Sequence, residues 1–169
     1  LYEQQPNYAP VMMYGSGENV ADYSVVTIGP GVTLRGWAGL FIDRHPEHGS
    51  QAYGIVANVH GTLESKRDIS NAGGHALYIN GTITSNDGNV PRFILDGATL
   101  ITEYGNGMYL AGYAETEIKD STITSNSEGS TGIEIRAGKL KISGDTEITG
   151  GSGEFTVVSN GNGSTTGNV

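Results

Sequence analysis

The chain has 169 residues, a formal net charge of −9 and an isoelectric point near 4.7. Its nine lysine and arginine residues are scattered, which argues against nucleic acid or an anionic membrane as a partner. There is no cysteine, so disulfides and thiolate metal sites are excluded, and no apolar run reaches the roughly 18 residues that a membrane-spanning helix needs.

One strand-like segment recurs along the chain. Its copies are residues 10–14, 39–43, 76–80, 107–111, 132–136 and, more weakly, 154–158. In each copy two apolar residues flank one variable residue, the pattern of a β-strand with one buried face. Recurrence at intervals of about 22 to 37 residues is typical of stacked repeats.

Two further strand patterns follow each copy, separated by a turn that is usually rich in glycine or aspartate. They are residues 24–28 and 32–35, 55–59 and 62–64, 92–95 and 98–102, 116–118 and 121–124, and 140–142 and 146–149. No segment has a sustained helical period. Three parallel strands per unit predict an all-β, right-handed parallel β-helix of about five to six turns. An antiparallel sandwich would not explain why every third strand repeats its pattern.

The domain organisation follows from this repeat. We expect one β-helix domain over residues 1–158, with residues 1–9 as a candidate N-terminal cap and residues 159–169 as a flexible linker of glycine, asparagine, serine and threonine. The chain has no signal peptide or initiator methionine, so we expect a piece of a longer protein with further domains. Open strand edges at the ends of the coil would allow self-association.

The residues between the inner apolar pairs must face outward, and they form the candidate site. Read along the stack, they are Met12, Phe41, Tyr78, Tyr109, Glu134 and Thr156, about 4.8 Å apart. A second outward row beside them is Tyr14, Asp43, Asn80, Ala111 and Arg136.

An aromatic strip with a polar fringe suits a hydroxyl-rich ligand or a weak protein contact. The predicted ligand-binding residues are Met12, Phe41, Tyr78, Tyr109, Asp43, Asn80, Glu134 and Arg136. Two alternatives stay open: the aromatics form a self-stacking ladder that only stabilises the coil, or a loop at residues 66–74 or a neighbouring domain covers them.

Two phrases carry a resemblance to a known family. They are Gly107-Met108-Tyr109-Leu110 and the segment 138–150, which begins Gly138-Lys139-Leu140. The chain resembles the pectate-lyase-like right-handed β-helix group, and more closely its adhesive, non-catalytic branch on bacterial surfaces. The resemblance covers about residues 10–158 and implies a secreted or cell-surface protein that binds carbohydrate or host glycoprotein.

Catalytic chemistry is not expected. The resemblance implies that enzymes of this group use clustered aspartates on this wall, with calcium and an arginine in the lyases. Here Asp43 and Glu134 are three turns apart, about 14 Å, whereas a glycosidase pair lies within about 5–9.5 Å. A passive stalk and, less favoured, a polysaccharide lyase or hydrolase remain the alternatives to an adhesin.

Other patterns predict no site, and we expect no metal or cofactor. His45, Glu47 and His48 are too few ligands in one loop for a metal, and residues 86–89 lack the spaced acids of a calcium loop. Thr122 and Thr124 resemble one step of an ice-binding Thr-x-Thr face, but we expect Leu100 and Glu147 to interrupt that face.

Overall fold

The computed structural model describes residues 9–15, 23–44, 53–66, 74–80, 88–151 and 157–159. These ranges contain β-strands and no helix, and therefore no candidate for a membrane-spanning helix. The strands are β1 (Val11–Gly15), β2 (Ser24–Ile28), β3 (Thr33–Gly36), β4 (Leu40–Arg44), β5 (Ile55–Val59), β6 (Thr62–Ser65), β7 (Leu77–Asn80), β8 (Arg92–Asp96), β9 (Thr99–Thr102), β10 (Met108–Lys119), β11 (Thr122–Ser125), β12 (Ile133–Ser143), β13 (Glu147–Thr149) and β14 (Val157–Ser159).

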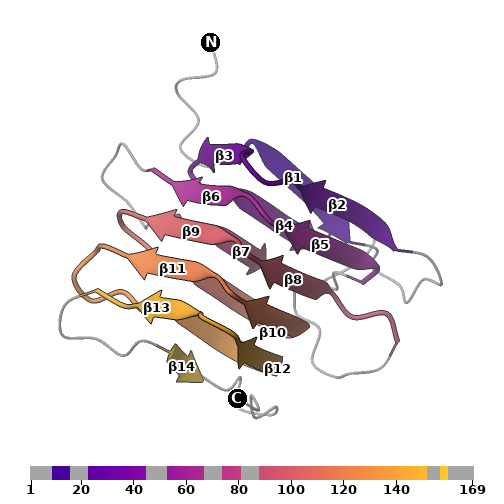
Figure 1. Cartoon of the computed structure of the whole chain (residues 1–169). Coiled ribbons are helices and arrows are strands. Elements are labelled where there is room, and N and C mark those ends of the chain that lie inside the picture. Colours follow the sequence, from indigo (N-terminus) through magenta and orange to yellow (C-terminus); the bar gives the residue numbers. More distant parts are fainter. Residues whose placement is uncertain are drawn as a thin grey trace.

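The strands stack in parallel as three walls (Figure 1). The first wall holds β1, β4, β7, the first part of β10 and of β12, and β14. The second holds β2, β5, β8 and the later parts of β10 and β12. The third is the separate sheet of β3, β6, β9, β11 and β13. Stacked parallel strands of this kind fit a β-solenoid, as the sequence predicts.

The expected strands are found at nearly their expected places, with one difference in how they are joined. The strands predicted separately at residues 107–111 and 116–118 belong to one strand, β10, and β12 likewise joins residues 132–136 to 140–142. β10 and β12 therefore bend from the first wall into the second without an interruption of the strand. The two walls form one nine-stranded sheet.

The core is a set of apolar columns that run along the stack. In the third wall, the inward residues are paired strand to strand in the order Leu34, Leu63, Leu100, Ile123 and Ile148. The three middle members have no exposed surface, while the first and last, at the ends of the coil, are only partly buried. Each turn is therefore covered by the turns on either side of it, which is how a solenoid buries its core.

The register corrects four details of the sequence analysis. The last strand of the first wall is shifted, so that Val158, and not Thr156, pairs with Glu134. Because β14 ends at Ser159, it includes the first residue of the expected linker. A β-bulge sets Ala111 and Gly112 of β10 opposite the single residue Arg136, so the second outward row is interrupted there.

The fourth correction concerns the threonines of the third wall. Leu100 points inward, and the outward column on consecutive strands is Thr33, Thr62, Thr99 and Thr122, ended by Glu147. The neighbouring outward column holds Arg35, Glu64, Ile101, Thr124 and Thr149. A repeated Thr-x-Thr face is therefore not formed by the described strands. Residues 1–8, 16–22, 45–52, 67–73, 81–87, 152–156 and 160–169 lie outside the described ranges. They include the histidine loop and most of the predicted cap, of the expected covering loop at residues 66–74 and of the linker.

Substitutions at two neighbouring residues of β8 test whether successive side chains point alternately into and out of the coil. Phe93 is fully buried, whereas Ile94 is exposed on the outer face. We expect Phe93→Ala to lower the free energy of unfolding by about 3–5 kcal/mol because it opens a cavity in the core. Ile94→Ala should lower it by less than about 1 kcal/mol. Urea unfolding followed by circular dichroism measures both, and equal losses would contradict the assigned faces.

Candidate functional site

The outward column of the first wall is formed as predicted. Met12 pairs with Phe41, Phe41 with Tyr78, Tyr78 with Tyr109, and Tyr109 with Glu134. The residues on either side of them point inward: Leu40 and Ile42 are buried in the core, and Val11 and Met13 at the end of the coil are partly buried. These five side chains therefore lie along the exterior of the coil, one strand apart.

The exposure of this column differs from one residue to the next. Met12 is 40% exposed, Tyr78 and Tyr109 are half-buried, and Phe41 is only 8% exposed. A row of open aromatic rings was expected, but the Phe41 ring is covered. Of the polar fringe, Asp43, Glu134 and Arg136 are half-buried, and the Asn80 side chain lies outside the described part.

Two residues that the sequence analysis did not assign to the site explain this burial. The Trp37 ring meets Phe41 and Tyr78 edge-on, at centroid distances of 5.7 and 5.6 Å. His75 stacks on Tyr109 at 4.8 Å and meets Tyr78 edge-on at 5.0 Å. We call Trp37, Phe41, His75, Tyr78 and Tyr109 the outer aromatic cluster.

Within this cluster the aromatic rings pack largely against one another. Phe41 and Tyr78 stack at 4.9 Å, and Tyr78 meets Tyr109 edge-on at 5.4 Å. Tyr109 carries His75 stacked on its ring and the Arg136 guanidinium 5.2 Å from its ring centroid. Ring pairs of this kind add roughly 0.5–1.5 kcal/mol each beyond the area that they bury, so the cluster stabilises the wall.

Trp37 and His75 reach the first wall from the corner that leads to it from the third wall. At this corner a buried hydroxyl donates a hydrogen bond to a backbone carbonyl of the neighbouring turn. The bonds run from Ser65 to Trp37 (2.6 Å), from Thr102 to Gly74 (3.1 Å) and from Ser125 to Gly105 (2.7 Å). The sequence signal was present: Thr62, Thr99 and Thr122 are each followed three positions later by one of these hydroxyl residues.

The corners also stack too closely for side chains. A Cβ atom at Gly74 would lie 1.6 Å from the carbonyl oxygen of Trp37, and one at Gly105 would lie 2.3 Å from that of Gly74. Only glycine fits at these two positions. The close approach brings the neighbouring corner residues, among them His75, over the first wall.

His75 links the aromatic cluster to a polar network. Its Nδ1 accepts a hydrogen bond from the backbone N–H of Asn106 at 3.0 Å. The Asn106 side chain repeats this arrangement one turn later, because its Oδ1 accepts the N–H of Thr131 at 3.0 Å. The Asn106 Nδ2 donates to Glu134 Oε2 at 2.8 Å.

Glu134 and Arg136 form the charged edge of the site. They lie two residues apart on β12, so both side chains face outward, and Arg136 Nε lies 3.4 Å from Glu134 Oε1. The guanidinium over Tyr109 and the amide of Asn106 hold this pair against the aromatic cluster. The pair therefore presents an anchored donor and an anchored acceptor beside Tyr109.

The tyrosine hydroxyls are neutral groups in this site. Burial raises the pKa of Tyr78, and the nearby Tyr109 and Asp43 raise it further. Burial also raises the pKa of Tyr109, against the opposing effect of Arg136. Both hydroxyls remain protonated at neutral pH and are able to donate hydrogen bonds.

The two outward acids of the first wall lie far apart in the described structure. Asp43 on β4 and Glu134 on β12 are separated by β7 and β10, which agrees with the three strand spacings expected. Within the described ranges, no group of three histidine, aspartate or glutamate side chains could hold a metal ion. Residues 45–48 lie outside these ranges, so the histidine loop is not described.

Comparison of the chain with protein families, curated proteins and solved structures found no match. The chemistry of the site itself is therefore the basis for assigning a function.

The half-buried His75 predicts a pH-dependent stability. Burial lowers the pKa of His75 from 6.5 to about 4, against the attraction of Glu134. Between these values the unfolded chain binds a proton that the folded chain does not bind. The stabilisation is therefore fully present above pH 6.5 and is lost as the pH falls toward 4. We expect the free energy of unfolding to be about 1.4 kcal/mol lower at pH 5.5 than at pH 8 because of this residue.

Urea unfolding at these two pH values checks this, with His75→Phe as the control. The phenyl ring retains the stacking on Tyr109 but does not titrate, so most of the pH difference should disappear. The variant should also lose about 1 kcal/mol at pH 8 because the N–H of Asn106 has no acceptor. A pH difference unchanged in the variant would show that other groups cause it.

Proposed function

We propose that the chain is a non-enzymatic binding segment of a secreted bacterial surface adhesin, and that the first wall binds carbohydrate, free or on a host glycoprotein. The observation that carries this proposal is the in-register row of Tyr78, Tyr109 and Glu134 with Arg136 anchored beside Tyr109. Neutral tyrosine hydroxyls with a carboxylate and a guanidinium offer donors and acceptors next to an apolar surface. Shallow sugar sites combine the same elements.

The burial of the aromatic rings restricts how a glycan could bind to the first wall. Because Phe41 is buried and Tyr109 is stacked on His75, the ligand would contact the rim of the outer aromatic cluster rather than lie flat along open ring faces. The proposed contacts are the exposed Met12, the edges of Tyr78 and Tyr109, and the polar groups of Asp43, Glu134 and Arg136. Asp43 and Glu134 outweigh the single charge of Arg136, so the rim has a net negative charge. This charge favours neutral glycans over anionic ones.

We also infer the finer architecture. The coil would be right-handed, because about 98% of parallel crossover connections have that hand, and it would belong to the pectate-lyase-like group that the sequence resembles. An experimental structure in which the strands advance with a left-handed turn would overturn this assignment.

A structural role is the second candidate, favoured by the mutual stacking of Phe41 on Tyr78 and of His75 on Tyr109. In this case the segment is a stalk, and the outer aromatic cluster only stiffens it. The two functions differ in one respect that is easily measured. A stalk binds no glycan, while changes in the cluster still lower its stability.

A matched pair of arginine variants tests the binding proposal. Arg136 and Arg92 both pair with a glutamate and lie over a tyrosine ring, but only Arg136 borders the proposed site. We expect Arg136→Gln to weaken binding to glycans selected from an array of neutral and acidic oligosaccharides by about tenfold, as for a lost charged hydrogen bond. Arg92→Gln should leave the affinity unchanged. If the wild type binds no glycan, the stalk is the better account. If both variants bind as well as the wild type, the glycan does not bind beside Arg136 and the proposed site is wrong.

Enzyme activity is tested separately. We expect no release of unsaturated or reducing ends from pectic polysaccharides, with or without calcium, because Asp43 and Glu134, the outward acids on the described strands of the first wall, are three strands apart and exceed the separation of a glycosidase pair. Release that is lost in Asp43→Asn or Glu134→Gln would instead establish a lyase or hydrolase.

A further inference from the structure

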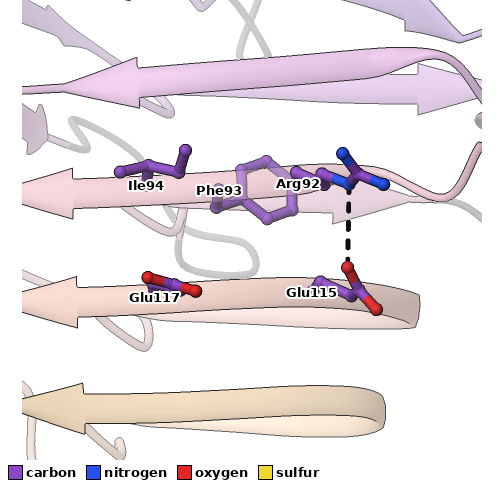
Figure 2. A pocket seen from close by; sticks show the side chains of 5 residues that line it. All are labelled: Arg92, Phe93, Ile94, Glu115 and Glu117. Carbon is purple, nitrogen blue, oxygen red and sulfur yellow. Dashed lines mark ion pairs between the residues drawn. The ribbon is translucent and has the colours of Figure 1, made fainter.

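The second wall carries a ladder of alternating charges. Arg92, Glu115 and Lys139 occupy one outward column on β8, β10 and β12, and Ile94, Glu117 and Lys141 occupy the next. Figure 2 shows the Arg92–Glu115 pair, with Ile94 and Glu117 farther along the same two strands. Together with Phe93, these residues line a pocket of about 280 Å³. Glu115 lies between two cations, with Arg92 Nε at 3.6 Å and Lys139 Nζ at 2.9 Å.

The ladder ends on the two lysines. Lys139 pairs with Glu115 at 2.9 Å, and Lys141 pairs with Glu117 at 3.6 Å. Both glutamates belong to β10, so each lysine has its partner on the side toward β10. On the other side β14 pairs only with residues Ile133–Ile135 of β12. Among the described residues no strand covers the part of β12 from Lys139 to Ser143, so this edge has backbone groups and lysine donors that face no further strand.

The same edge leaves the apolar core open. Ile142 belongs to the inward column that also contains Leu95 and Ile118. Leu95 and Ile118 are fully buried, but Ile142 is 42% exposed. Leu140, its inward neighbour on β12, is also only partly buried. An added strand would bury these two side chains in the way that β12 buries Ile118.

We propose that the Lys139–Ser143 edge of β12 binds an extended strand of a partner protein in which acidic residues alternate with aliphatic residues. The acidic side chains would lie opposite Lys139 and Lys141 and continue the ladder, while the aliphatic side chains cover Leu140 and Ile142. Backbone hydrogen bonds to the open edge would supply affinity, and the alternating side chains would supply specificity.

A second copy of this chain fits the edge poorly. At the opposite end of the second wall, the outward residues of β2 that occupy the same two columns are Val25 and Thr27, which carry no charge. Stacking β2 on β12 would therefore give the lysines no carboxylate. Pairing two β12 edges would set lysine near lysine, which is destabilising.

The probe for this proposal is a blocked, fluorescently labelled hexapeptide in which glutamate and valine alternate, measured by fluorescence anisotropy. We expect it to bind at least tenfold more tightly than a lysine–valine peptide, which reverses the charge, or a glutamate–serine peptide, which removes the apolar anchor. Binding should weaken in 0.5 M salt because the ion pairs are on the surface.

Substitutions on the exposed edge locate the site without opening the core. Lys139→Gln/Lys141→Gln should weaken binding roughly three- to tenfold, and Ile142→Thr should weaken it independently. Arg35→Gln is the matched control, since Arg35 is another exposed cation paired with a glutamate, Glu64, on the third wall. Circular dichroism of each variant confirms the fold.

Three results would overturn the proposal. The first is no binding of the glutamate–valine peptide at millimolar concentration. The second is equal binding of the acidic and basic peptides, or an affinity that the lysine substitutions leave unchanged. The third is self-association in sedimentation equilibrium that is abolished by Ile142→Thr, which would assign the edge to a second copy. None of these results depends on glycan binding at the first wall.

Discussion

Parallel stacking of one turn on the next is the constraint on which the structure depends. A single turn of this chain has three short strands and cannot bury its inner side chains. The column of Leu34, Leu63, Leu100, Ile123 and Ile148 is closed only where a turn is present on both sides. The low apolar content and the many glycines are compatible with such a core because it is narrow and its corners are tight.

The same stacking determines the outer surface. Register places like positions of successive turns about one strand spacing apart, so any outward position becomes a column. On the first wall this produces the outer aromatic cluster, and on the second wall it produces the ladder from Arg92 to Lys139. Surface chemistry in this protein is therefore organised along the axis of the coil.

The two surfaces differ in how complete they are. In the outer aromatic cluster the rings are packed against one another, and the groups left for a ligand are the edges and the Glu134–Arg136 pair. In the charge ladder Glu115 has a cation on each side, whereas Lys139 and Lys141 each have an ion-pair partner on one side only within the described ranges. A site of the first kind suits a small polar ligand, and one of the second kind suits another strand.

The sequence by itself determined the strands, their parallel stacking and the outward direction of Met12, Phe41, Tyr78 and Tyr109, because a period of two and a recurring segment are local properties of the chain. It did not determine that Phe41 is covered, that Trp37 and His75 complete the cluster, or that Val158 takes the place expected for Thr156. These features depend on how closely corners such as Gly74 and Gly105 approach each other, and on which register lets apolar columns continue. The approach of the corners and the register of the strands are decided by contacts between residues of different turns. The spacing of residues along one strand does not predict such contacts.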